Sequence, residues 1–255
     1  MIRMDTRNLP ALDGRYWAAI LVASLLGTTL GDFVSSTLTL GFLGGLLPLC
    51  VVIAVIFALE RRAKAPSEVY YWATIVATRT MATNIADLFT HALKLDYRWV
   101  AAVFALLLVG ALLLGQRSGF RLARTRSPAL PNADARYWLA ILFASILGTT
   151  LGDFVSEGLG LGLARGAILL GIILCAVLYL QSRVVTSSTS LYWLAIVAVR
   201  TSGTVMGDFL SSSEGVNLGF ALSAATMALL LVGILRFWQQ DAIAVTLAKH
   251  RTRPN

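Results

Sequence analysis

The feature that most constrains this chain is an internal repeat. The segment GTTLGDFVS occurs at residues 27–35 and again at residues 148–156, and RYW occurs at residues 15–17 and 136–138. Both pairs are offset by 121 residues. Two separate motifs with one common offset indicate a tandem duplication, so the chain consists of two related halves.

Each half contains an older repeat of 55 residues. Every copy opens with Tyr-Trp and carries an aspartate 15 residues after that tryptophan. The four tryptophans are Trp17, Trp72, Trp138 and Trp193. Four equal spacings do not arise by chance, so the chain is predicted to fold as four copies of one unit.

The composition places these copies in a membrane. Hydrophobic residues make up 57% of the chain and charged residues 13%, about half the charged share of an ordinary soluble domain. Apolar stretches of about 17 to 25 residues can cross a bilayer as helices. Eight such stretches are predicted, at residues 16–36, 41–59, 70–90, 99–115, 137–157, 159–180, 191–211 and 216–237.

Two spans in each copy predict an all-α, polytopic membrane protein of eight transmembrane helices. Because each copy returns the chain to the same side, the four two-helix repeats are expected to be parallel, around an axis along the membrane normal. The first four-helix half is expected at residues 1–115, a basic linker at 116–136, the second half at 137–238 and a tail at 239–255.

The basic residues predict the orientation. If the N-terminus is cytoplasmic, 16 of the 21 Lys and Arg residues lie in cytoplasmic segments, so the positive-inside rule places both termini in the cytoplasm. Topology therefore explains the net charge of +8, which does not predict a nucleic-acid partner. The repeated Tyr-Trp pair fits the cytoplasmic interface, where amphipathic rings anchor helix starts.

A polar stripe accompanies the repeated aspartates, because steps of four residues stay on one helix face. The aspartates are Asp32, Asp87, Asp153 and Asp208. Four residues before them stand Thr28, Thr83, Thr149 and Thr204, and eight before them stand Ser24, Arg79, Ser145 and Arg200. Four residues after them stand Ser36, His91, Glu157 and Ser212.

These polar residues must turn away from lipid, because an ionised side chain deep in a bilayer costs on the order of 3 kcal/mol. The first, third, fifth and seventh spans are therefore expected to form an inner ring. The even-numbered spans, which are almost purely apolar, are expected to surround it. Small residues beside the stripe, such as Gly27, Gly31, Gly148 and Gly152, would allow the inner helices to approach closely.

The tandem units resemble a bacterial membrane protein family built from a fourfold "repeat of unknown function". The resemblance covers Arg15 to Trp238 and is closest at Thr28-Thr29-Leu30-Gly31-Asp32 and Thr149-Thr150-Leu151-Gly152-Asp153. It is looser around Asp87 and Asp208. The resemblance implies a bacterial inner membrane protein and names no substrate.

The charge of the stripe favours transport of a small cation. The four Asp residues and Glu157 outnumber Arg79 and Arg200, so a cation or protons are needed to balance them. The Asp and Thr residues would line the pathway, and the two arginines would gate it or pair with its charges. Oxygen ligands with one imidazole, His91, suit a divalent metal such as manganese. No tightly bound cofactor and no enzymatic activity are expected, and a homo-oligomer is compatible with the sequence.

Two alternatives remain open. In the first, the stripe is a structural or sensory core, in which Arg79 and Arg200 pair with Asp residues on adjacent helices and the Thr hydroxyls bond to backbone carbonyls. In the second, the two arginines bind a small organic acid as the substrate of a carrier.

Overall fold

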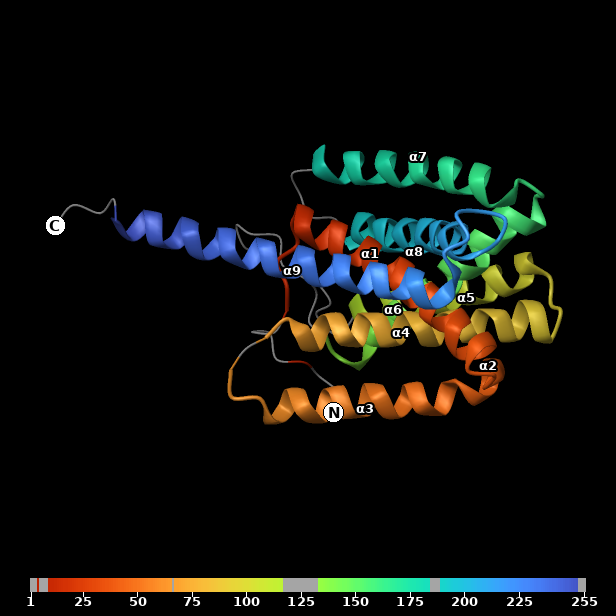
Figure 1. The fold of residues 1–255 in the computed structure, drawn as a ribbon, viewed down its shortest axis with the longest axis horizontal. Coiled ribbons are helices and arrows are strands. Elements are labelled where there is room, and N and C mark those ends of the chain that lie inside the picture. The colour runs from red at the N-terminus through yellow and green to blue at the C-terminus, as the bar shows by residue number, and fades with distance from the viewer. Residues whose placement is uncertain (1–3, 5–8, 66, 117–132, 184–188, 252–255) are drawn as a thin grey trace.

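The computed structural model describes residue 4 and residues 9–65, 67–116, 133–183 and 189–251. These residues form eight long helices and one short one (Figure 1). Four are inner helices: α1 (Gly14–Asp32), α4 (Val69–Asp87), α6 (Ala135–Asp153) and α8 (Thr189–Ser211). The outer helices are α3 (Leu46–Arg62), α5 (Tyr97–Gln116), α7 (Gly162–Arg183) and α9 (Gly219–Arg251), and the short helix is α2 (Gly41–Gly44).

The inner helices form a closed ring. Helix α1 packs against α4, α4 against α6, α6 against α8, and α8 against α1. All four run in the same direction, because each has a tyrosine in its first turns and these four tyrosines are joined by hydrogen bonds at one end of the ring. The predicted inner ring is therefore present, and its four helices are parallel.

Each outer helix packs on the inner helix of the next copy. Helix α3 lies on α4, α5 on α6, and α7 on α8, while the last helix, α9, returns to pack on α1. The contact between α9 and α1 joins the last copy to the first. Consecutive copies are thus interlocked, and the whole chain closes into a cycle of four units.

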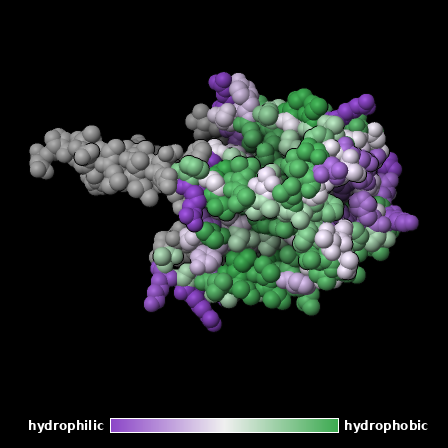
Figure 2. All heavy atoms as spheres, in the orientation of Figure 1, coloured by the Kyte–Doolittle hydropathy of each residue, from purple (hydrophilic) through white to green (hydrophobic). Residues whose placement is uncertain are grey.

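The surface is that of an integral membrane protein. Leu47, Leu106, Ile168 and Leu229, one from each outer helix, are all more than 60% exposed. Figure 2 shows apolar residues across the middle of this face and hydrophilic residues toward its two ends. Within the described residues, six helical segments are long and apolar enough to cross a membrane. Helices α4 and α8 fall short of that measure, because they carry the buried arginines and their polar neighbours.

The helix ends follow local chemistry. The side chain of Asp13 accepts a hydrogen bond from the backbone N–H of Tyr16, and Asp134 does the same for Tyr137, so aspartates cap α1 and α6. After the repeated aspartate, three inner helices continue as π-helical turns, a form often found at functional sites. These turns are η2 (Phe33–Thr37), η3 (Leu88–Ala92) and η4 (Phe154–Gly158).

The second predicted span is present as one membrane-length segment, Gly41–Arg62, in which α2 continues through Gly45 into α3. One boundary differs from the sequence prediction. Helix α9 continues to Arg251, so most of the segment assigned to a tail is helical. The basic linker predicted at residues 116–136 lies largely outside the described residues.

Small residues set the distance between inner helices, as predicted. A Cβ atom added to Gly148 would meet the Arg200 side chain and, at 3.0 Å, the backbone C of Arg200 and the backbone N of Thr201. At Gly31 it would lie 2.8 Å from the Thr83 side chain. Neighbouring backbones therefore approach as closely as glycine allows.

We expect Gly148→Ala to destabilise the protein by about 1–3 kcal/mol, because the added methyl group meets backbone atoms of α8. The matched control is Gly110→Ala on α5, where an added Cβ meets nothing within 4 Å. Thermal unfolding in detergent should show a lower midpoint for the first variant and an unchanged or higher one for the second. Equal midpoints would contradict close packing of α6 on α8.

Candidate functional site

Residues at every fourth position of the inner helices form a series of layers through the ring. The sequence prediction covered the Ser/Arg, Thr, Asp and rim layers, and the structure adds two below them. Four fully buried isoleucines come next, at Ile20, Ile75, Ile141 and Ile196. The last layer consists of four buried tyrosines, Tyr16, Tyr71, Tyr137 and Tyr192.

An acidic cavity occupies the end of the ring formed by the Asp and Thr layers. It has a volume of about 190 Å³. All ten residues predicted for the pathway and the metal ligands line it, together with Ser35, Ser36, Phe42 and Phe220. These ten are Asp32, Asp87, Asp153, Asp208, Thr28, Thr83, Thr149, Thr204, His91 and Glu157.

The negative charge of this cavity has little local compensation. Among the described residues, neither Arg79 nor Arg200 has a carboxylate oxygen within ion-pair distance. The Asp153 side chain is 6% exposed, and its Oδ2 atom has no hydrogen-bond partner. The expected pairing of the two arginines with the aspartates is therefore absent.

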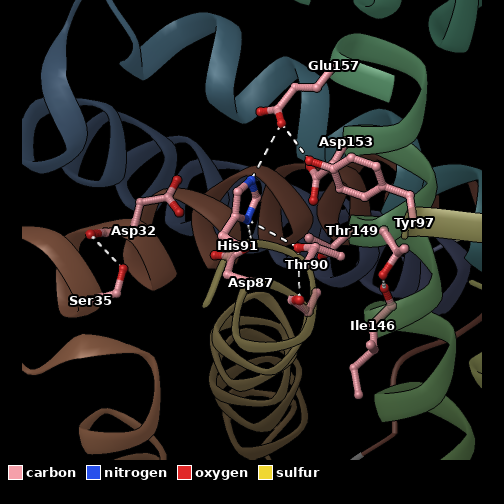
Figure 3. A network of polar contacts seen from close by, with 12 residues as sticks. Asp32, Ser35, Asp87, Thr90, His91, Tyr97, Ile146, Thr149, Asp153 and Glu157 are labelled. Atoms are coloured by element: carbon pink, nitrogen blue, oxygen red, sulfur yellow. Dashed lines mark hydrogen bonds and ion pairs between the residues drawn. The ribbon is translucent and has the colours of Figure 1, made fainter. Parts of the chain in front are cut away.

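One side of the rim is bridged by His91. Its Nδ1 atom lies 3.6 Å from Asp87 Oδ1, and its Nε2 atom lies 3.5 Å from Glu157 Oε2 (Figure 3). The hydroxyl of Tyr97 donates to the same Glu157 oxygen at 2.7 Å. Since Ser36 and Ser212 stand at the equivalent positions of the other two copies, the bridge breaks the fourfold symmetry of the rim.

The Thr layer is crosslinked by Arg79. Its guanidinium donates to the hydroxyl of Thr28 at 2.8 Å, to that of Thr204 at 2.5 Å and to that of Thr149. The same guanidinium donates to the carbonyl oxygens of Ser145 at 3.1 Å and Arg200 at 3.4 Å. One buried side chain thus ties α4 to the other three inner helices.

Arg200, the counterpart of Arg79 in the second half, behaves differently. It is fully buried, yet none of its three guanidinium nitrogens has a hydrogen-bond partner among the described residues. Its electrostatic neighbours are the four tyrosines of the last layer. The two arginines therefore occupy different environments although the sequence repeat makes them equivalent.

The tyrosine hydroxyls close the far end of the ring. Hydrogen bonds join Tyr16 to Tyr71 at 3.1 Å, Tyr71 to Tyr137 at 2.7 Å, Tyr137 to Tyr192 at 3.1 Å, and Tyr192 back to Tyr16 at 2.8 Å. The Tyr-Trp pairs were expected to anchor the helix starts at the interface, but all four tyrosines are buried inside the protein. Three of the tryptophans, Trp72, Trp138 and Trp193, are buried as well, so of the four only Trp17 is partly exposed. Counting back 16 residues from each Asp would have placed the tyrosines on the polar stripe.

The predicted metal ligands do not form a ready cluster. Within the part of the chain that the structure describes, no three His, Cys, Asp or Glu side chains are placed to hold one metal ion. The carboxylates are spread around the wall of the cavity because each comes from a different inner helix. The predicted divalent metal stays a prediction.

The four copies match the profile of one known family. The Repeat of Unknown Function (DUF347) matches residues 15–65, 70–119, 136–186 and 191–240, which together make up most of the chain. The chain belongs to this family. Each matched DUF347 repeat begins one residue before a ring tyrosine and contains one inner and one outer helix. Neither a curated protein nor a solved structure matches the chain.

Replacing one ring tyrosine should weaken the closed end of this DUF347 protein. Tyr137→Phe removes two of the four hydroxyl hydrogen bonds and is expected to cost about 1–2 kcal/mol. Tyr179→Phe is the matched control, because Tyr179 lies exposed on α7. Thermal unfolding should separate the two variants, and an unchanged midpoint for Tyr137→Phe would contradict the hydrogen-bonded ring.

Two equivalent threonines offer a sharper comparison. Thr204 and Thr83 both line the cavity, but only Thr204 accepts a hydrogen bond from Arg79. We expect Thr204→Val to destabilise the protein by about 2 kcal/mol, because a hydrogen bond to a buried charge is lost. Thr83→Val should have a much smaller effect on the same unfolding midpoint. Equal effects would show that Arg79 does not distinguish the two threonines.

Proposed function

We propose that this protein is a transporter that moves a small cation across the membrane, with the acidic cavity as the site where the ion binds. The observation that carries the proposal is the set of four aspartates around one cavity, of which only Asp87 has an ion-pair partner, His91, among the described residues. Carboxylates without counterions inside a membrane protein attract cations or protons. A parallel ring of repeats is an arrangement that commonly surrounds such a pathway.

The pathway is closed below the cavity. Arg79 crosslinks the Thr layer, four isoleucines follow, and the tyrosine hydroxyls join at the far end. An apolar layer between two polar ones is a common form of gate, because water leaves it readily. Transport therefore requires Arg79 to leave the threonines and the inner helices to separate at the isoleucine and tyrosine layers.

The chemistry of the cavity limits how a metal could bind. A divalent ion such as manganese would keep water molecules between itself and most of the carboxylates, because no three of them converge in the described residues. Proton exchange fits the same site, since a carboxyl group that loses a cation can take up a proton. The proposed substrate is thus a small cation, with a divalent metal and proton coupling as its specific form.

The membrane arrangement proposed for this function uses all eight long helices. Helices α4 and α8 have polar sequences, but they lie in the inner ring and are covered by α3 and α7. Their polarity therefore faces protein and not lipid. The positive-inside rule would place both termini in the cytoplasm of a bacterial inner membrane and the acidic cavity on the opposite side.

The two alternatives have less support. A carrier of organic acids would need its anionic substrate to pass the aspartates before reaching Arg79. A purely structural core would leave the unpartnered Asp153 Oδ2 atom unexplained. The hydrogen bonds of Arg79 to three threonines do give that layer a structural role as well.

Neutralising two opposite aspartates tests the proposal. We expect Asp32→Asn combined with Asp153→Asn to abolish cation flux in proteoliposomes while leaving the unfolding midpoint almost unchanged, because neither residue is ion-paired to an arginine. The flux of Mn²⁺, Mg²⁺, Na⁺ and K⁺ would be measured separately with ion-sensitive dyes. Asp96→Asn is the matched control, since Asp96 pairs with Arg98 outside the cavity.

The outcomes are distinct. Loss of flux in the double variant, with normal flux for Asp96→Asn, supports the proposal. Wild-type protein that moves none of these ions, or a double variant that transports normally, contradicts it. A double variant that unfolds at a much lower temperature would favour the structural alternative.

A further inference from the structure

The oxygen atoms around Arg79 form a defined binding site. We name this the threonine socket: the hydroxyls of Thr28, Thr149 and Thr204 and the carbonyl oxygens of Ser145 and Arg200. All five acceptors are neutral, and together they surround one guanidinium group. Among the described residues no carboxylate accepts a hydrogen bond from this guanidinium, and the aspartates of the next layer act on its charge only from a longer distance.

Neutral oxygens select a particular class of cation. Divalent metals prefer sites that include carboxylates, whereas hydroxyl and carbonyl oxygens accept hydrogen bonds from N–H groups. A planar guanidinium donates hydrogen bonds in several directions within one plane. The socket oxygens accept hydrogen bonds from both terminal nitrogens of Arg79. The socket therefore matches guanidinium and ammonium groups better than a divalent metal.

The socket lies at the inner end of the acidic cavity. Its three threonines line that cavity together with the four aspartates. A cation drawn in by the aspartates would thus meet the threonine layer next. The guanidinium of Arg79, which is fully buried, occupies the position that such a cation would take in the threonine layer.

Arg200 shows that the fold can hold an arginine outside the socket. The offset of 121 residues relates Arg79 to Arg200, yet the fully buried guanidinium of Arg200 makes no hydrogen bond to the socket oxygens or to any other group among the described residues. An Arg79 side chain that left the socket would free it to bind another cation.

We propose that the threonine socket is a binding site for one small cation bearing N–H donors, of the guanidinium or ammonium class, and that Arg79 occupies it as a built-in substitute for that ligand. This inference rests on the proposed transport of a small cation, and it replaces the divalent metal by a cation with N–H donors as the substrate class of the same pathway. The aspartates concentrate cations, and the socket selects among them.

The experiment removes the Arg79 side chain from the socket and adds free guanidinium in solution. In the variant Arg79→Ala combined with Arg200→Ala, neither arginine side chain is left to fill the socket. Millimolar guanidinium chloride should raise the unfolding midpoint of this variant saturably in detergent. Urea, which has nearly the same shape but no charge, should not. Wild-type protein should show no such rise, because Arg79 already fills the socket.

A third substitution tests the site itself. Adding Thr149→Val to the double variant should abolish the stabilisation by guanidinium, whereas adding Thr150→Val, which removes a hydroxyl bonded only to the carbonyl oxygen of Ile146 in its own helix among the described residues, should not. If the double variant does not survive purification, the same titration on Arg79→Ala decides. Saturable stabilisation supports the inference, and none, or an equal effect of urea, overturns it.

Wild-type protein provides a second measurement that needs no variant. Proteoliposomes should take up labelled guanidinium and exclude urea. If the vesicles move a metal ion but not guanidinium, and the arginine variants gain no stability, the socket inference fails while the proposed function stands. If guanidinium stabilises the variants but no cation crosses the membrane, the transport function fails and the socket remains.

Discussion

The guanidinium of Arg79 is the interaction on which the centre of this protein depends. It belongs to α4 and donates to side chains or carbonyls of α1, α6 and α8, so the four inner helices meet at one charge. Inside a bilayer the N–H groups of such a charge cannot bond to bulk water, so the protein must supply their hydrogen-bond acceptors. That requirement explains why the helices approach so closely at Gly27, which packs against the side chain of Arg79.

The sequence predicted the architecture because the repeat and the bilayer together leave few alternatives. A polar stripe that repeats every four residues and carries Asp and Arg must face inward. The even-numbered spans lack such a stripe and must therefore cover it. The structure confirms the inner ring and the all-α fold, and the family match confirms the four repeats. The interlocking of copies, in which α9 packs on α1, could not be predicted, because every outer helix is apolar on all sides and fits more than one neighbour.

The partners of individual side chains were harder to predict. Tyr16 and its three equivalents precede a tryptophan near the start of a span, a pattern that an interfacial anchor and a buried hydrogen-bonded ring share. The structural alternative paired Arg79 and Arg200 with aspartates on adjacent helices. The side chain of Arg79 instead reaches across the ring to threonines, and the guanidinium of Arg200 makes no hydrogen bond among the described residues. Such choices depend on rotamers and on the neighbouring helices, which spacing along one helix does not encode.

The departures from symmetry carry most of the functional meaning. A ring of four identical copies would place four equal side chains at the axis, where four arginines could not fit and would repel one another. Here two copies carry serine at that layer and two carry arginine, and only one arginine enters the threonine socket. The rim differs in the same way, with His91 and Glu157 facing each other and serines in the other two copies. Duplication thus supplies a closed ring with many oxygen acceptors, and divergence between copies leaves one central site, which the guanidinium of Arg79 occupies.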